Sequence, residues 1–421
     1  MIRESMRREL APREREALDA LGIRAEFPLL AREFDGRPLT YLDSAATAQK
    51  PRAVLAAMDR LYETQYGPIA RGVHRLAAEA TAAYEGARAR VARFLGAAET
   101  EIVFTRGTTE AVNLVAWSFA RPRLAPGDEI LVTELEHHSN FVPWQLVAAE
   151  RGARLVAVPI TERGEIDPDE FERHLSPRTR MAAIAHVSNT LGTVLPVTEL
   201  VARAQARGVP VLVDGAQSAP HRPIDVALMG CDFFAFSGHK LYGPTGIGAL
   251  FGRREHLESM PPWQGGGGMI REVALEGTTF DDPPRRFEAG TPAAVEAVGL
   301  AAAIDFLEAC GWPQIAAHES ALVDAAVDGL TAIPGVTVVG RPRERSSVVA
   351  FMVDGAHAHD VGTVLDHHGV AVRAGHHCTQ PLHRRLGLAA TVRASFAIYN
   401  TLQDVDRLLA GVRAARELLA R

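Results

Sequence analysis

The chain has 421 residues, of which 47% are hydrophobic and 23% charged, and its formal net charge is −6. This composition supplies a substantial apolar core and predicts a globular protein with more than one domain. The mild negative charge and the lack of a long basic block exclude nucleic acid and anionic membrane surfaces as expected partners.

The cysteines and the apolar runs indicate the cellular compartment in which the protein is expected. The three cysteines, Cys231, Cys310 and Cys378, form no disulfide framework. No run of about eighteen apolar residues predicts a membrane span. Residues 1–25 mix acidic and basic side chains without an apolar centre, so they match neither a secretory signal nor a transit peptide. We therefore expect a protein of the reducing cytoplasm whose first residues form a charged helix or a frayed tail.

The first two thirds of the chain alternate between short apolar runs and helix-length segments. After a short strand within 39–46 and helices over 51–66 and 77–94, the pattern predicts strands near 101–105, 129–133, 154–159, 181–187, 210–214, 232–236 and 247–251. Such alternation predicts an α/β domain with a largely parallel sheet that is covered on both faces. Loops are expected around 264–269 and 281–284.

A different order follows the alanine-rich helix expected over 293–310. The pattern predicts a smaller α+β region with helices at 313–333, 359–368 and 402–420 and strands at 336–339, 347–353, 370–373 and 391–398. We expect a large domain over 38–305 and a small domain over 306–421, with residues 1–37 packing as an N-terminal extension.

Lys240 and Asp214 are the first candidates for chemistry. Lys240 lies between an apolar strand and the glycine-rich turn 243–248, and Asp214 ends the apolar run that begins at Pro210. A single lysine at a strand end is usually a solvated surface residue. Pyridoxal phosphate, however, needs both a lysine for a Schiff base and a carboxylate opposite its ring nitrogen. The pair therefore indicates a site for this cofactor.

Two further stretches support such a site. Thr108 and Thr109 follow a strand and a glycine where a helix begins, a position that suits either an anion or a plain helix cap. Cys378 lies in a polar loop beside imidazoles and near Arg373, where a nucleophilic thiolate is expected. A zinc site is disfavoured, because no Cys-x-x-Cys or His-Glu-x-x-His pattern is present and the other two cysteines lie in apolar segments, so no metal is expected.

Several motifs in chain order resemble one family. They are Tyr41–Pro51, Arg106–Glu110, Glu136–Asn140, Asp214–Gln217, Ser237–Lys240, Phe287–Pro292 and Arg373–Cys378. From Phe27 onward the chain resembles the SufS/CsdA-type (group II) cysteine desulfurases, which are pyridoxal-phosphate enzymes of fold type I in the class V aminotransferase superfamily. The resemblance implies a large domain with a mainly parallel seven-stranded sheet and a smaller C-terminal domain that carries the cysteine loop.

The resemblance also implies residue roles. Lys240 would form the Schiff base and Asp214 would hold the ring nitrogen. The other cofactor contacts would come from Gln217, Asn189, His137, Thr108, Thr109, Ser237 and His239, with Thr291 donated by the second subunit of a homodimer. Arg393, with Asn189 and Arg373, would bind the substrate carboxylate, and His137 would stack on the ring and share in catalysis with Lys240 and Cys378.

The implied reaction converts L-cysteine to L-alanine. Cys378 would keep the sulfur as a persulfide and pass it to an acceptor protein of the SufE or SufU type, for iron–sulfur cluster assembly. The alternatives are a selenocysteine lyase, another C–S lyase, an aminotransferase or a kynureninase. A non-catalytic sulfur-relay scaffold is disfavoured because Lys240, Asp214 and Arg393 are all present.

Overall fold

The computed structural model describes residues 22–70 and 72–419. The helix or tail expected over residues 1–25 therefore lies, up to residue 21, outside the described residues. The chain divides into two compact units. Unit 1 takes in the described residues up to Arg52, then Asn189–Thr193 and those from Phe306 onward, and unit 2 comprises Ala53–Ser188 and Val194–Asp305.

Unit 2 is built on a seven-stranded sheet in the order β4-β10-β9-β8-β7-β5-β6. Its strands are β4 (Ile102–Thr105), β5 (Glu129–Thr133), β6 (Arg154–Val158), β7 (Thr179–Ala185), β8 (Val211–Asp214), β9 (Phe233–Ser237) and β10 (Gly248–Gly252). The pairs β9–β8–β7–β5–β6 are all parallel, and β10 runs antiparallel to both of its neighbours. The mainly parallel α/β sheet expected from the sequence is confirmed.

Four strands in the interior of the sheet, β5, β8, β9 and β10, are buried along their whole length. Successive residues of a strand point to opposite faces, so full burial means that both faces of the sheet are covered. The edge strand β6 is mostly exposed or half-buried. This pattern explains why the strands appear in the sequence as continuous apolar runs.

The helices of this region are α3 (Arg52–Thr64), α4 (Arg75–Leu95), α5 (Thr108–Leu114), α6 (Val142–Arg151), α7 (Pro168–His174), α8 (Val197–Gln205), α9 (Val226–Met229), α10 (Arg254–Ser259) and α11 (Ala294–Cys310). Helices α5 to α9 fall between the strands, as the alternation predicts, whereas α3 and α4 precede β4 and α10 and α11 follow β10. A buried apolar cluster that includes Val112, Trp144 and Phe233 joins α5 and α6 to the sheet. None of the helices in the described part of the chain is long and apolar enough to cross a membrane.

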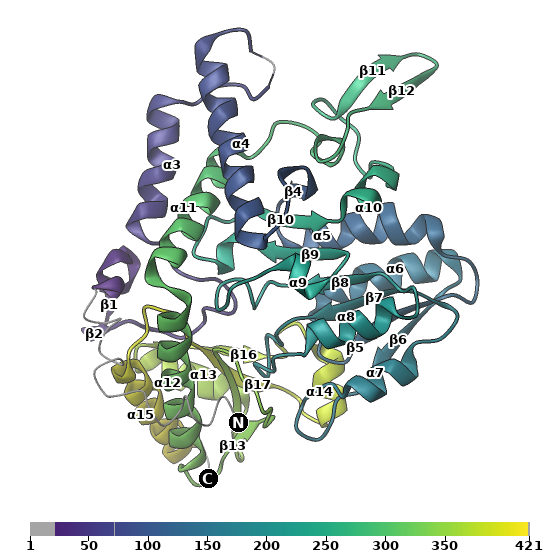
Figure 1. The fold of residues 1–421 in the computed structure, drawn as a ribbon. Helices are drawn as coiled ribbons and strands as arrows, with labels where there is room; N and C mark the ends of the chain where they lie inside the picture. The colour runs from purple at the N-terminus through teal and green to yellow at the C-terminus, as the bar shows by residue number, and fades with distance from the viewer. Residues whose placement is uncertain (1–21, 71, 420–421) are drawn as a thin grey trace. The chain divides into compact units, whose positions relative to one another are not determined.

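One hairpin was missed by the sequence pattern. Strands β11 (Ile270–Ala274) and β12 (Gly277–Phe280) pair antiparallel and project from the rest of unit 2 (Figure 1), within a stretch bounded by two predicted loops. Nearly all of its residues are exposed, including Val273 and Leu275. Because neither face packs on a core within the chain, the sequence carries no alternation of apolar and polar residues there.

Unit 1 contains a four-stranded antiparallel sheet in the order β13-β14-β17-β16. Its strands are β13 (Val336–Val339), β14 (Val348–Val353), β16 (Arg373–Gly375) and β17 (Thr391–Ser395), and its helices are α12 (Trp312–Thr331), α13 (Ala358–His367), α14 (Gln380–Leu386) and α15 (Leu402–Leu419). A second apolar cluster, which includes Leu322, Phe351 and Leu408, joins these helices to the sheet. The unit therefore has a core of its own.

The strand predicted over 370–373 is two strands. β15 (Val370–Ala371) pairs parallel with β3 (Thr40–Tyr41), and β16 pairs with β17. The prediction of one strand was wrong because the hydrophobic pattern is continuous across Val372 while the pairing partner changes there. The exposed hairpin of β1 (Glu33–Phe34) and β2 (Arg37–Pro38) precedes β3.

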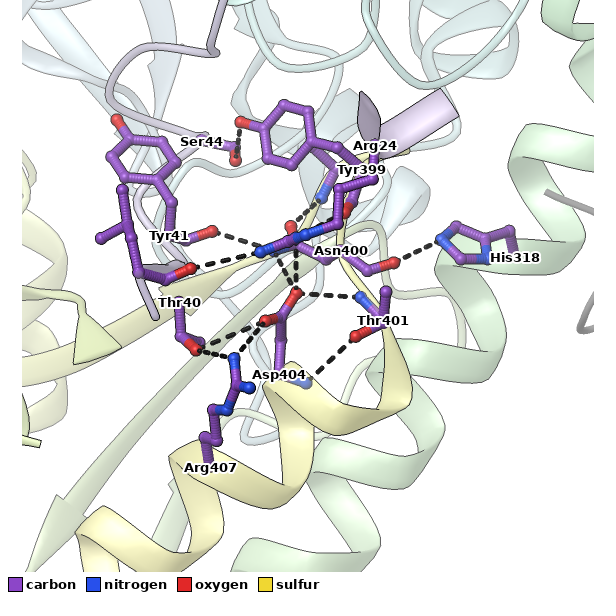
Figure 2. A network of polar contacts seen from close by, with 12 residues as sticks. Arg24, Thr40, Tyr41, Ser44, His318, Tyr399, Asn400, Thr401, Asp404 and Arg407 are labelled. Carbon is purple, nitrogen blue, oxygen red and sulfur yellow. Dashed lines mark hydrogen bonds and ion pairs between the residues drawn. The ribbon is translucent and has the colours of Figure 1, made fainter. Parts of the chain in front are cut away.

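Asp404 fastens the N-terminal segment of unit 1 to α15. Its carboxylate is 1% exposed, and Oδ2 accepts hydrogen bonds from Arg24 Nη1 at 3.1 Å and from Asn400 Nδ2 at 3.2 Å. Oδ1 accepts one from Thr40 Oγ1 at 3.3 Å, and Asn400 Nδ2 also donates to Tyr41 O at 3.0 Å. Figure 2 shows this network, which holds β3 in position. The residues that follow β3 therefore start from a fixed base.

Candidate functional site

Asp214 is a buried carboxylate at the end of β8. Only 6% of the residue is exposed, and Oδ1 accepts a hydrogen bond from Ala216 N–H at 2.9 Å. Burial raises the pKa of Asp214, while the Ala216 N–H and the positive charge of Lys240 act to lower it. A cationic or N–H donor partner would therefore stabilise this carboxylate in its ionised form.

Lys240 lies in the short 3-10 helix η7 (Gly238–Lys240), directly after β9. The side chain is half-buried, and its charge acts on Asp214 within unit 2. Gly238 is required at the start of this turn, because a Cβ atom there would lie 2.9 Å from Ile247 Cγ2. The two residues that the sequence paired thus lie at the ends of neighbouring strands of one sheet and interact electrostatically.

A polar cradle lies where β4 leads into α5. Thr108 N–H donates to Ser237 Oγ at 2.9 Å, and the two hydroxyl oxygens are also 2.9 Å apart. Gly107 has a φ of 147°, and a Cβ atom there would lie 3.1 Å from Ser237 Oγ. A larger residue would therefore push the start of α5 away from the end of β9. The arrangement gathers hydroxyls and a helix-start N–H group, which suits a phosphate.

His137 follows β5 and its ring is half-buried. Nδ1 accepts a hydrogen bond from Ser139 N–H at 3.1 Å, so the neutral ring carries its proton on Nε2. The preceding Glu136 is buried, and it accepts hydrogen bonds from Asn140 Nδ2 at 2.6 Å and from Ala185 N–H at 3.0 Å. Burial raises the pKa of Glu136 to about 8. Glu136 thus ties the His137 segment to β7.

The other predicted cofactor contacts differ in accessibility. Gln217 is buried, His239 is half-buried, and Thr109 and Thr291 are exposed. Thr291 lies between η8 (Arg285–Phe287) and α11, in a segment anchored by Glu288, whose carboxylate accepts two hydrogen bonds from Arg88 at 2.7 and 2.9 Å.

Arg393 is the most buried cation among the predicted site residues of unit 1. It is 2% exposed on β17, its Nη1 donates to Asn189 O at 3.0 Å, and its Nη2 donates to Asp43 Oδ1 at 2.9 Å. Burial lowers the pKa of Arg393, while Asp43 acts to raise it. Among the described residues, Arg393 Nε has no hydrogen-bond partner although it is buried. This guanidinium is therefore built to receive a further acceptor.

Cys378 lies exposed in the loop after β16. His377 and Cys378 have φ values of 51° and 57°, a left-handed conformation that is costly for residues with side chains. Asn189 Nδ2 holds this loop by donating to His377 O at 2.7 Å, and His377 Nε2 lies 2.9 Å from Thr391 Oγ1. Burial lowers the pKa of His377 to about 2, so its ring is neutral.

The predicted residues thus form two groups. Unit 2 holds Lys240, Asp214, Gln217, His137, Thr108, Thr109, Ser237, His239 and Thr291, and unit 1 holds Cys378, Arg393, Arg373 and Asn189. Asp43 has no role among the sequence-based predictions, yet it contacts both Arg373 and Arg393. Its place in the Tyr41–Pro51 motif was the available signal, but a single carboxylate after a short strand does not identify its partner.

No group of three or more metal-ligating side chains occurs among residues 22–70 and 72–419.

The residues of unit 2 fit pyridoxal phosphate. Asp214 offers a buried, under-compensated carboxylate for a protonated ring nitrogen, and Lys240 offers an amine. The Gly107 turn leaves room for the phosphate-type cradle of Thr108 and Ser237. Each part of the cofactor therefore finds a side chain or backbone group of the right chemistry.

Comparison with known proteins gives a consistent result. A family model described as aminotransferase class-V matches residues 40–408. A cysteine desulfurase of Pectobacterium atrosepticum is 49% identical over 94% of this chain and 98% of its own length. The crystal structure of the Escherichia coli cysteine desulfurase CsdA, in its S-sulfonic acid form, has a TM-score of 0.88 and 44% identity over 95% of this chain and 98% of that one. A C-DES mutant structure with glycine covalently linked to its pyridoxal phosphate cofactor has a TM-score of 0.79 and 26% identity over 93% and 98% of the two chains.

Proposed function

The chain belongs to the class-V aminotransferase family and, within it, to the cysteine desulfurases, and on this premise we propose that it releases L-alanine from L-cysteine and keeps the sulfur on Cys378. In this reaction the Cβ–S bond of the substrate breaks, a bond forms between Cys378 Sγ and the departing sulfur, and the carbon fragment takes up a proton. A thiol and L-cysteine thus become a persulfide and L-alanine, so that atoms and electrons balance.

The residues of unit 2 serve the cofactor. Bound pyridoxal phosphate would supply an electron sink for the electron pair that stays on the substrate Cα when its proton leaves. Lys240 would hold the cofactor through its amine, and the same amine would move the proton at the substrate Cα. Asp214 would keep a proton on the ring nitrogen, and the His137 ring would stack on the ring of the cofactor.

The phosphate is assigned to the cradle of Thr108, Thr109, Ser237 and His239, and Gln217 and Asn189 are assigned to the ring oxygen. Thr291 completes the phosphate site of a second subunit, so the enzyme acts as a homodimer. The exposure of Thr291 supports this assignment, since a residue that serves a neighbouring chain lies at the surface of its own. Sedimentation that finds a fully active monomer would remove it.

One residue carries the assignment of the substrate site. Asn189 accepts a hydrogen bond from Arg393 through its backbone oxygen and donates one to the Cys378 loop through its side chain, at 3.0 and 2.7 Å. Asn189 would therefore position both the arginine that binds the substrate carboxylate and the loop that carries the sulfur-accepting thiol. Arg373 adds a second positive charge on β16.

Cys378 is exposed on a strained loop, which suits delivery of sulfur to another protein. We infer an acceptor of the SufE or SufU type and a role in iron–sulfur cluster assembly. A free thiol that must stay reduced to act as a nucleophile fits the cytoplasm.

The test is Cys378→Ala, with Cys310→Ala as the matched control. The Cys378 variant should bind pyridoxal phosphate and change its visible spectrum with L-cysteine, yet form alanine on the order of 10³-fold more slowly or worse. The control should form alanine and persulfide at the parent rate. Full desulfuration by Cys378→Ala would leave a C–S lyase that needs no thiol as the better assignment.

A further inference from the structure

Two arginines lie directly opposite each other in the small sheet. Arg373 on β16 and Arg393 on β17 are Cα partners in the antiparallel register, so their side chains share one face. Like charges in this position repel each other. The Asp43 carboxylate lies between them, with Oδ1 2.9 Å from Arg393 Nη2 and Oδ2 3.8 Å from Arg373 Nη1. Asp43 therefore compensates both cations at once.

Asp43 binds only one of the two N–H groups on one side of the Arg393 guanidinium. A carboxylate that binds an arginine side-on takes both Nε–H and Nη2–H. Asp43 takes Nη2, whereas Nε is buried without a partner among the described residues. Leaving a buried donor unmade is costly. Half of the fork of Arg393 is thus held by Asp43 and half is left for another acceptor.

The backbone that carries Asp43 is fixed. Leu42 is fully buried, its N–H donates to Ala371 O at 2.9 Å, and its carbonyl accepts from Ser395 N–H at 2.7 Å. The preceding strand β3 is tied to α15 through the Asp404 network of Figure 2. A change at Asp43 therefore has to occur in its side chain, between two guanidinium groups of different exposure: 2% for Arg393 and 47% for Arg373.

We propose that Asp43 is a positioning and specificity-determining residue. It pairs with Arg393 before the substrate binds, and it pairs with Arg373 once one substrate carboxylate has bound to Arg393. The inference rests on the proposed function, in which Arg393 binds the substrate carboxylate. Its chemical consequence is a preference for monocarboxylates. The retained negative charge of Asp43 repels a second carboxylate, so a dicarboxylic amino acid is disfavoured.

Replacing Asp43 and replacing its partner Arg373 should then have opposite effects on carboxylate binding. Asp43→Asn keeps the size and an oxygen acceptor but removes the competing charge, so carboxylates should bind more tightly. Arg373→Gln leaves Asp43 with Arg393 alone, so carboxylates should bind more weakly. A merely structural role for Asp43 would instead weaken binding in both variants.

The experiment uses propionate and succinate, which have neither the amine nor the sulfur of the substrate. Their inhibition constants are measured against L-cysteine for the holoenzyme, and their effect on the unfolding temperature is measured for the apoprotein. For Asp43→Asn we expect propionate to bind about tenfold more tightly, with a larger gain for succinate, and for Arg373→Gln we expect about tenfold weaker propionate binding. Asp406→Asn, which removes an exposed carboxylate of α15, is the charge control and should match the parent protein.

Propionate binding by Arg393→Lys separates the role of Asp43 from the assignment of the substrate site. If Arg393→Lys weakens propionate binding while Asp43→Asn leaves it unchanged or weakens it, Arg393 is the carboxylate site and Asp43 only supports the fold. If Arg393→Lys has no effect on propionate, the substrate site itself is misassigned.

Discussion

The two units handle a buried charge in different ways. In unit 2, Asp214 ends a parallel strand, and within the described chain one backbone N–H is its only hydrogen-bond donor. In unit 1, Arg393 lies within an antiparallel strand and is paired with a carboxylate of its own chain, Asp43. Unit 2 therefore presents a charge that a bound cation can complete, whereas unit 1 holds a neutralised pair that a ligand has to rearrange. The first arrangement suits a resident cofactor and the second suits a substrate that enters and leaves.

The two lysines of the chain allow the largest test of this contrast. Lys240 belongs to unit 2 and Lys50 to unit 1, and the sequence contains no other lysine. Lys240→Ala should fold, lose the visible absorption band of the bound cofactor and have no measurable desulfurase activity. Lys50→Ala should keep the band, although burial lowers the pKa of Lys50 to about 8 and so makes its amine more nucleophilic. A band that survives in the Lys240 variant and vanishes in the Lys50 variant would reverse the assignment.

Asp214→Asn removes the negative charge that we propose pairs with the ring nitrogen of the cofactor. Because the amide cannot stabilise a protonated ring nitrogen as an anion does, we expect kcat to fall about 10²- to 10³-fold. Cofactor affinity, measured by equilibrium dialysis, should also fall. Asp225→Asn, at a helix cap of the same unit, is the control for loss of one carboxylate, and it should alter stability without altering the spectrum of the bound cofactor.

Arg393→Lys tests the unit 1 side of the comparison. Lysine keeps the positive charge but loses the planar fork, so the loss in transition-state stabilisation should be about 2–4 kcal/mol. The ratio of kcat/KM for the parent and the variant measures it. Unchanged saturation by L-cysteine and unchanged turnover would show that Arg393 does not contact the substrate.

The smallest expected effect concerns two buried histidines, one in each unit. Burial lowers the pKa of His377 to about 2 and that of His186 to about 3, from an ordinary value of 6.5. The unfolded chain therefore takes up protons at these rings below pH 6.5 while the folded protein does not, so stability falls as the pH falls. Between pH 6.5 and 5 each histidine should cost about 2 kcal/mol.

The measurement is the slope of the unfolding free energy against pH, from urea titrations. His377→Gln and His186→Gln should each flatten the slope between pH 6.5 and 5. His359→Gln, at an exposed position of α13, should leave it as it is. If all three variants kept the parent slope, the two buried rings would take up protons in the folded protein over the same pH range as in the unfolded chain.

The sequence by itself determined the elements and the chemistry of single residues. The strands β5, β8 and β9 lie within one residue of the expected ranges, because each is a buried apolar run bounded by breakers, and such a signal is local. Lys240 and Asp214 were identified from the cofactor's needs. The motifs, read in order, indicated the family that the comparisons show.

Only the tertiary structure decided which of these residues work together. Asn189 belongs to unit 1 although unit 2 surrounds it in the sequence, and Asp43 meets Arg393 across 350 positions of the chain. The exposed hairpin of β11 and β12 and the change of partner between β15 and β16 also escaped the sequence pattern. The physical reason is the same in each case. Periodicity records whether a residue is buried, whereas pairing depends on which distant segment the folded chain brings beside it.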